Sequence, residues 1–280
     1  PTFEDYFDSK ARLFTELTPA GAPAVVNVDS DWGEAMAERA RAARLDVVTL
    51  GWRGRDLKIE EITPRAASQH LRFIWRGEAR DADLPLIGEF QAANALGAAV
   101  MAIVGGAPEA RVWAALEGLT GVPGRLETAV VTRQGCPVLV DYAHTPDGLD
   151  KLLRAARPHT KGRVMVVFGA GGDRDPSKRK PMGETAARLA DMVYVTDDNP
   201  RSEDAAAIRR AILTGAPDAI EIADRAEAIA AAVAELREGD ALLLAGKGHE
   251  TGQIVGDRVI PFDDREAARA AVERQEARNR

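Results

Sequence analysis

The chain has 280 residues, 45% of them hydrophobic, and a formal net charge of −7 at pH 7. This length and hydrophobic content are enough to bury a sizeable core and to form two domains. The acidic balance argues against nucleic acid as the main partner, because phosphate binding needs a net basic face. The single cysteine, Cys136, excludes an intramolecular disulfide framework and a cysteine-based zinc site, and it suits a reducing cytoplasm.

Two further properties concern the location of the protein and its completeness. No apolar run reaches the ~20 residues that a transmembrane helix needs, and no basic start leads into the apolar segment of a signal peptide. We therefore expect a cytoplasmic protein without a membrane partner. Because the sequence begins at Pro1 without an initiator methionine, we also expect it to be a fragment of a longer protein.

The first part of the chain alternates helical and strand patterns. Apolar residues at helical spacing predict helices, and short runs rich in Val, Ile and Leu predict strands. A Gly/Pro cluster at 121–124 is the best candidate for a domain boundary, which we place between residues 122 and 123. Before it, helices are predicted at 6–17, 32–43, 90–104 and 108–116, and strands at 24–28, 46–50, 57–62 and 71–75.

Two polar residues stand out in these helices. Lys10 lies three residues after Phe7 and four before Phe14, which places it on an apolar stripe. Its stem could follow that stripe while the ammonium reaches water, or the ammonium could be desolvated and react as a neutral amine. The periodicity leaves both possibilities open. Asn94 interrupts a helix rich in Ala and Leu, where an exposed position is the default for an amide.

The second part reads as a regular series of strands and helices, which is typical of an open α/β sheet. A hairpin is expected at 254–261, turning at Gly256, and a charged helix follows from Asp264. Before the hairpin, strands are predicted at 138–140, 164–168, 193–196, 219–222 and 241–245, and helices at 146–156, about 185–190, 205–213 and 225–236.

Polar loops follow three of these strands, at 169–175, 197–201 and 246–250. Ligands of open α/β sheets bind beyond the carboxyl ends of the strands, so we expect the three loops to converge on one edge. The turn at 169–172 lacks the third glycine of a dinucleotide fingerprint. It still offers a backbone that a ligand can approach.

The side chains of these loops suit a zwitterion. Arg174 and Arg201 offer guanidinium forks for a carboxylate. Asp198, Asn199 and Glu250 offer acceptors for an ammonium group. Each of these residues could instead belong to a solvated turn or a helix cap. The neighbouring carboxylates at 197–198 could bind a divalent metal, although adjacent side chains at a strand end usually point apart.

Four motifs follow one another along the chain: Asp-Tyr-Ala-His-Thr-Pro at 141–146, Gly-Gly-Asp-Arg-Asp at 171–175, Asp-Asn-Pro-Arg at 198–201 and Gly-Lys-Gly-His-Glu at 246–250. They resemble the signature loops of the Mur ligases, the amide ligases of peptidoglycan assembly, and the resemblance spans the whole chain. The third motif resembles that of the branch that adds meso-diaminopimelate, since lysine-adding relatives carry a different residue in place of Arg201.

The resemblance implies an α/β fold in two parts. Residues 1–122 would be the C-terminal part of a central ATPase domain, and residues 123–280 a Rossmann-like domain that binds the amino acid. It also implies a reaction in two steps. ATP phosphorylates the γ-carboxylate of D-Glu in UDP-MurNAc-L-Ala-D-Glu, and the amine of meso-diaminopimelate then attacks the acyl phosphate. Mg²⁺ would offset the charge on the transferred phosphoryl group.

The resemblance also assigns residues. Lys10 would be carbamylated, which turns a cation into a carboxylate that supports the Mg²⁺ site. The residues near the nucleotide would be Asn94, Arg125, Asp141 and His144. The residues that bind meso-diaminopimelate would be Arg174, Asp198, Asn199, Pro200, Arg201, Gly246 and Glu250, with the arginines on the distal carboxylate and Glu250 on the ammonium.

One departure from the family pattern is large. The family's P-loop, Gly-Thr-x-Gly-Lys-Thr, is absent from these 280 residues, as are the UDP-binding N-terminal domain and the acidic metal ligand expected before Lys10. Without a P-loop no backbone cradles the phosphates, so we expect a fragment that is inactive alone. We also expect it to be monomeric.

Other functions stay open beside this one. The missing P-loop would also fit a stand-alone module that binds an amino acid without catalysis. A glutamate-adding ligase of the folylpolyglutamate synthetase kind is disfavoured by Arg201 and by the motif at 246–250. A nicotinamide-dependent oxidoreductase has the least support, because the third fingerprint glycine is missing.

Overall fold

A computed structural model describes residues 2–278, and their packing separates two units. The first unit comprises the chain up to Thr63 together with Ser68–Pro85 and Glu89–Leu119. The second comprises Pro64–Ala67, Leu86–Gly88 and the chain from Thr120 onward. No helix described over residues 2–278 is both long enough and apolar enough to cross a membrane. The assignment of residues 1–122 and 123–280 to two functional domains stays a prediction.

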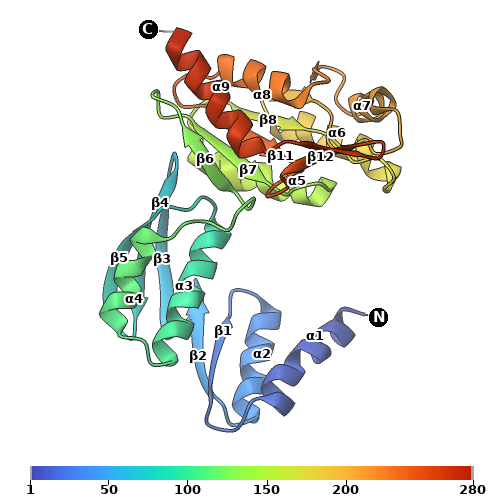
Figure 1. The fold of residues 1–280 in the computed structure, drawn as a ribbon. Helices are drawn as coiled ribbons and strands as arrows, with labels where there is room; N and C mark the ends of the chain where they lie inside the picture. The colour runs from blue at the N-terminus through green and yellow to red at the C-terminus, as the bar shows by residue number, and fades with distance from the viewer. Residues whose placement is uncertain (1, 279–280) are drawn as a thin grey trace. The chain divides into compact units, whose positions relative to one another are not determined.

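The first unit is built on a five-stranded sheet in the order β1-β2-β3-β4-β5 (Figure 1). β1 and β2 are parallel, as are β2 and β3, whereas β4 and β5 form an antiparallel hairpin. The strands are β1 Pro23–Asn27, β2 Asp46–Gly51, β3 Leu57–Arg65, β4 Ser68–Trp75 and β5 Glu78–Leu84. The helices are α1 Phe3–Arg12, the π-helical turn Leu13–Leu17, α2 Asp31–Ala42, α3 Glu89–Val104, α4 Glu109–Ala115 and the 3₁₀ turn Leu116–Gly118.

Local signals explain where two of these helices start. Thr2 and Asp5 form a reciprocal capping box at α1, and the Ser30 side chain accepts a hydrogen bond from the Gly33 N–H at α2. The strand β5 was not predicted, because only Ala82 and Leu84 of its side chains are buried. Its pairing with β4 through a tight turn makes it a strand.

The second unit is a six-stranded sheet in the order β10-β9-β8-β11-β7-β6, in which β6 alone runs antiparallel to its neighbour. The strands are β6 Glu127–Val131, β7 Pro137–Asp141, β8 Val164–Phe168, β9 Met192–Val195, β10 Ile220–Glu221 and β11 Ala241–Ala245. The helices are α5 Pro146–Ala156, α6 Arg179–Leu189, α7 Ala205–Leu213, α8 Arg225–Ala234 and α9 Asp264–Arg278. The 3₁₀ turns Arg157–His159 and Pro176–Lys178 complete the set.

Helices cover both faces of this second sheet. Apolar side chains of α5, α6 and α7 form one buried cluster with the sheet, and those of α8 and α9 form another. Figure 1 shows α8 and α9 on one side of the strands and α5 on the other. The strands β8 and β11 are fully buried because both faces are covered, which explains their continuous apolar sequences.

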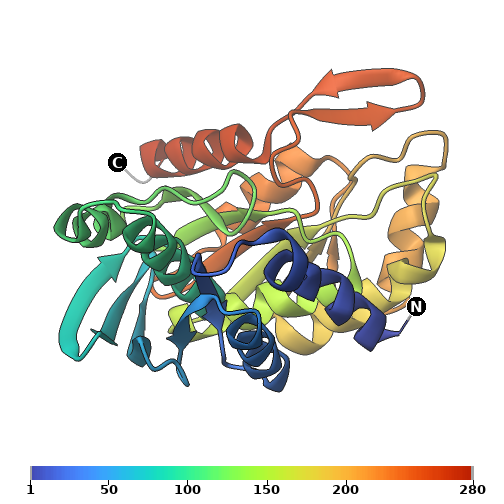
Figure 2. The ribbon, with the colours of Figure 1, turned by 90° about the horizontal axis from the view of Figure 1, so that it is seen from below.

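One helix of the second unit differs from the prediction, and the hairpin near the end of the chain agrees with it. The helix α6 begins at Arg179, several residues before the predicted start at 185, since Pro181 lies in the first turn, where proline is tolerated. The hairpin of β12 Gly252–Val255 and β13 Arg258–Pro261 confirms the predicted turn at Gly256. In Figure 2 this hairpin extends from the sheet as a two-stranded arm.

Candidate functional site

The parallel strands β7, β8, β9 and β11 point in the same direction, so the loops that follow them lie at one edge of the second sheet. Hydrogen bonds join these loops. The Gly172 N–H donates to the Asn199 carbonyl at 2.8 Å, and the Asn199 side chain reaches Glu250. The predicted convergence of the loops at 169–175, 197–201 and 246–250 is therefore confirmed.

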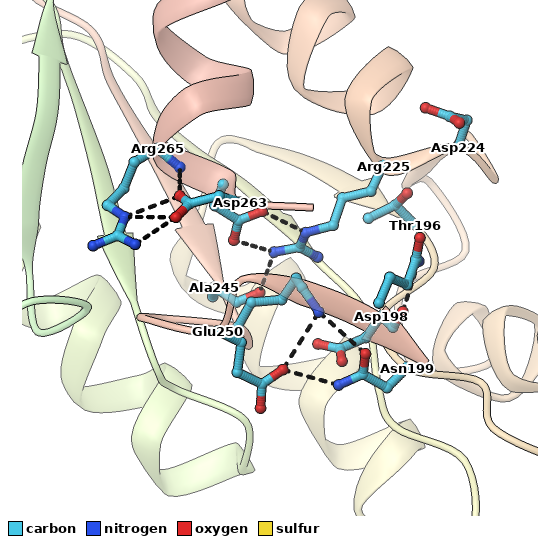
Figure 3. A network of polar contacts seen from close by, with 12 residues as sticks. Thr196, Asp198, Asn199, Asp224, Arg225, Ala245, Glu250, Asp263 and Arg265 are labelled. Carbon is cyan, nitrogen blue, oxygen red and sulfur yellow. Dashed lines mark hydrogen bonds and ion pairs between the residues drawn. The ribbon is translucent and has the colours of Figure 1, made fainter. Parts of the chain in front are cut away.

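Asn199 is the centre of the polar contacts at this edge (Figure 3). Its Oδ1 accepts from the Ile254 N–H at 2.9 Å and from Lys247 Nζ at 3.1 Å, and its Nδ2 donates to Glu250 Oε2 at 2.9 Å. Only 4% of Asn199 is exposed. Every polar atom of this amide is used, so its orientation is fixed by its neighbours.

Arg201 has a left-handed backbone with φ 52°, which non-glycine residues adopt rarely. Its N–H donates to the Ile254 carbonyl at 3.0 Å, and its carbonyl accepts from the Gly256 N–H at 2.7 Å. The β12–β13 hairpin thus clamps the backbone of Arg201. The guanidinium Nη1 donates to the Gly172 carbonyl at 2.7 Å, which holds the fork beside the β8 loop.

Glycine at position 171 makes room for this guanidinium, since a Cβ there would lie 2.9 Å from Arg201 Nη1. Arg174, the second predicted fork, is exposed, and its Nη1 donates to the Asp173 carbonyl at 3.3 Å. Asp173 in turn accepts from the Ser202 hydroxyl and N–H, which lowers the pKa of its carboxyl group. The β8 and β9 loops are therefore tied together beneath Arg174.

The neighbouring carboxylates at 197 and 198 have separate environments. Asp197 pairs with Arg209. Asp198 is buried, and its Oδ2 lies so close to the backbone of Gly246 that a Cβ there would approach it within 2.6 Å. Pro200 is also buried, and its carbonyl accepts from the Glu203 N–H at 3.1 Å. Of the predicted ligand-binding set, Asp198, Asn199, Gly246 and Glu250 come together.

Two buried cations beneath this edge were missed. Lys247 has no exposed surface, and its Nζ contacts Glu250 Oε2 at 3.4 Å as well as Asn199. Arg225 makes two 2.7 Å hydrogen bonds to the carboxylate of Asp264 and one of 3.0 Å to the Ala245 carbonyl. A sequence signal existed for Lys247, because it lies inside the motif at 246–250. None marked Arg225, since its partner is 39 residues away.

The charges around Arg225 explain its protonation. Burial by itself lowers the pKa of Arg225, but Asp264 and, further off, Asp198 and Glu250 raise the pKa above its ordinary value. A buried guanidinium that pairs with one carboxylate and faces two more is stably charged. It supplies a fixed positive charge under the site.

The residues predicted near the nucleotide lie in both units. In the second, Asp141 Oδ2 accepts from the Leu126 N–H and Oδ1 from the Ala143 N–H, each at 2.8 Å, while burial raises the pKa of its carboxyl group. His144 and Arg125 are exposed, and both lie close to Tyr142. The His144 and Tyr142 ring centroids are 4.6 Å apart, and the Arg125 guanidinium is 5.3 Å from the centre of the Tyr142 ring.

The remaining predicted residues belong to the first unit. Asn94 is exposed on α3, as expected for a polar amide in that helix. Lys10 is exposed as well, with its ammonium 5.4 Å from the centre of the Tyr6 ring. Of the two possibilities for Lys10, the exposed ammonium agrees with a stem that follows the apolar stripe, on which Phe7 is buried and Phe14 half-buried.

A magnesium site at a carbamylated Lys10 stays a prediction. In the part of the chain that the structure describes, no group of three or more His, Cys, Asp or Glu side chains could hold a metal ion.

The sequence and fold were compared with known proteins. Residues 1–102 match the model of the Mur ligase middle domain, and residues 124–248 match that of the Mur ligase glutamate ligase domain. The chain is 52% identical, over 277 residues, to a curated relative from Chelativorans sp. (strain BNC1) named UDP-N-acetylmuramoyl-L-alanyl-D-glutamate–2,6-diaminopimelate ligase. The match covers 99% of this chain and 57% of the relative. A relative of the same name from Agrobacterium fabrum is 49% identical, with 97% and 56% covered.

Solved structures agree with these sequence matches. A structure titled as a ligase of the same name matches with a TM-score of 0.76 and 31% identity, covering 99% of this chain and 57% of that one. A folylpolyglutamate synthase from Thermotoga maritima matches with a TM-score of 0.67 at 19% identity, covering 85% and 54%, which shows a shared fold alone. The chain thus spans a little over half the length of the curated relatives it matches. With two Mur ligase domain models matched in order along most of its length, the chain belongs to the Mur ligase family.

Proposed function

We propose that this chain forms part of an ATP-dependent ligase that joins meso-diaminopimelate to UDP-MurNAc-L-Ala-D-Glu through an acyl phosphate. The observation that carries the proposal is the edge of the second sheet, where the Arg201 guanidinium and the Glu250 carboxylate are both held in place by Asn199 and the loops around it. A guanidinium and a carboxylate on one edge suit an amino acid with a charged group at each end. The names of the relatives from Chelativorans and Agrobacterium support this choice of ligand.

The ligand would be oriented by its charges. We assign Arg201, together with the exposed Arg174, to the distal carboxylate of meso-diaminopimelate. Glu250 and the buried Asp198 would face an ammonium group, while Gly246 lets the backbone of the β11 loop approach closely. Asn199 would act by holding Glu250, and Pro200 by shaping the turn that presents Arg201.

The nucleotide is assigned to other residues. In the second unit, Arg125 and His144 beside Tyr142 offer a cation and an aromatic surface for ATP. Asp141 would order their loop, because both of its oxygens accept main-chain hydrogen bonds. Asn94 on α3 of the first unit is assigned to the nucleotide by family resemblance.

Calorimetric titration of the chain with meso-diaminopimelate and with lysine tests the assignment of Arg201. Lysine lacks the distal carboxylate, so we expect the chain to bind meso-diaminopimelate at least about tenfold more tightly, the usual worth of a charged hydrogen-bonded pair. Arg201→Ala should abolish this preference and leave lysine binding unchanged.

Arg210→Ala is the matched control, because Arg210 is an exposed arginine of α7 in the same unit. It should leave the affinities for both ligands unchanged. Equal binding of the two ligands by the unaltered chain, or a preference that survives Arg201→Ala, would contradict the proposed function of this site.

A further inference from the structure

The ammonium of Lys247 is out of contact with water, although a lysine is seldom buried without a reason. Lys247 is the second residue after β11, and the loop that contains it brings Glu250 back within 3.4 Å of Nζ. The side chain therefore points inward beneath the edge of the sheet rather than toward a ligand above it. Its two described contacts, Asn199 Oδ1 and Glu250 Oε2, both belong to the candidate site.

These contacts fix the direction of the Asn199 amide. An asparagine can place its oxygen and nitrogen in either of two ways, and only the donors around it decide between them. Lys247 Nζ and the Ile254 N–H both donate to Oδ1, so Nδ2 must face Glu250. Removing the ammonium would leave the Ile254 N–H as the one described donor to Oδ1, with Glu250 accepting from Nδ2.

The same contacts fix the Glu250 carboxylate. Its Oε2 accepts from Asn199 Nδ2 at 2.9 Å and from Lys247 Nζ at 3.4 Å. Figure 3 shows the other oxygen of Glu250 turned away from the network. The Glu250 side chain is 35% exposed, so this second oxygen is the part of the group that a ligand can reach.

The charges of the cluster also favour a role for Lys247. Lys247 and Arg225 are its buried cations, Asp198, Glu250 and Asp264 are its carboxylates, and Lys178 interacts electrostatically with Asp198. Removing the charge of Lys247 would leave Glu250 without the cation that it pairs with.

We propose that Lys247 is a positioning residue for the amino-acid ligand. By holding Asn199 Oδ1 and Glu250 Oε2, it presents the remaining Glu250 oxygen to a single ammonium group. Lys247 does not touch the ligand itself. The identity of the ligand rests on the proposed function, but the effect of Lys247 on Asn199 does not.

The test uses the 280-residue chain and its Lys247→Met variant, which keeps the length of the side chain and removes the charge. Glu250 is partly solvated and Asn199 keeps the Ile254 N–H, so the variant should fold, as circular dichroism can verify. We expect it to bind meso-diaminopimelate about tenfold more weakly, as for the loss of a hydrogen bond to a charged group. In the ligand-free protein, NMR should show the side-chain amide protons of Asn199 exchanging faster with water.

Lys151→Met is the matched control, since Lys151 forms a lysine–carboxylate pair with Asp147 on the surface of α5. It should change neither measurement. If Lys247→Met does not fold, Lys247→Leu removes the same charge and the same donor and carries the same expectations.

The two proposals fail differently. If the unaltered chain does not bind meso-diaminopimelate, the proposed ligand is wrong. The exchange rate of the Asn199 side-chain amide protons then still tests the role of Lys247. If the chain binds the ligand but the variant binds it within about twofold, or if the Asn199 protons exchange at an unchanged rate, Lys247 is not a positioning residue.

Discussion

At the scale of single residues, Gly246 has a backbone conformation that favours glycine and lies in the candidate site. Its φ of +115° is one that side chains other than glycine rarely allow, and a Cβ would lie 2.6 Å from Asp198 Oδ2. Both facts require glycine here. The family motif at 246–250 predicted a ligand role for this residue, and the structure adds a steric one.

Gly246→Ala should therefore displace Asp198 and weaken binding of meso-diaminopimelate by more than about tenfold, in addition to lowering the melting temperature. Gly135→Ala separates the two effects, because Gly135, between β6 and β7, also has positive φ, at +80°, but a Cβ there meets nothing within 4 Å. That control should cost about 1–2 kcal/mol of stability and spare binding. Equal loss of binding in both variants would argue against a steric role for Gly246.

At the scale of elements, the start of α9 joins the hairpin to the sheet. Two consecutive aspartates there pair with different arginines. Asp264 binds Arg225 beneath the site, and Asp263 Oδ1 accepts from the N–H of Arg265 at 2.8 Å, which caps the helix. Hydrogen bonds from the Arg265 guanidinium hold the pKa of the Asp263 carboxyl group below its ordinary value.

This depressed pKa has a consequence for stability. The stabilisation from Asp263 is fully present above the pKa of an unfolded aspartate, about 3.9, and is lost as the pH falls through the lower folded value. Asp263→Asn can keep the cap but removes the charge that pairs with Arg265, so it should lower the free energy of unfolding by about 1 kcal/mol at pH 7.

The difference between Asp263→Asn and the unaltered chain should shrink below about pH 4. Denaturant titrations between pH 3 and 7 measure it. Asp257→Asn, in the exposed turn of the β12–β13 hairpin, is the control and should leave stability unchanged. A difference that stays constant down to pH 3 would rule out the Asp263–Arg265 pair as its source.

At the scale of the whole molecule, the chain holds the sheet edge that we assign to the amino acid but no P-loop sequence within its 280 residues. Incubation with ATP, UDP-MurNAc-L-Ala-D-Glu and meso-diaminopimelate should thus release no phosphate above background, even where calorimetry detects binding. The relative from Chelativorans, assayed in parallel, is the positive control. Phosphate release that depends on all three substrates would show that this chain is catalytic by itself.

The sequence alone was sufficient to predict the limits of elements with a strong local pattern. The limits of β8, β11 and α7 agree with the prediction, since continuous apolar runs and a regular helical stripe are strong local signals. The unpredicted strands β5 and β6 are both edge strands that pair antiparallel with one neighbour. Their half-polar sequences become strands only because that neighbour offers hydrogen bonds.

Some residues of the candidate site could likewise be predicted from the sequence, and others only from the tertiary structure. Motifs and the strand-end rule identified Asn199, Arg201 and Glu250 from the sequence, because loops after parallel strands must share an edge. Only the tertiary structure placed Lys247 and Arg225 beneath them and exposed Lys10, since burial depends on which distant segments pack against a side chain. Local pattern therefore determined where the polar groups lie along the chain, and packing decided which of them face each other and which are buried charges.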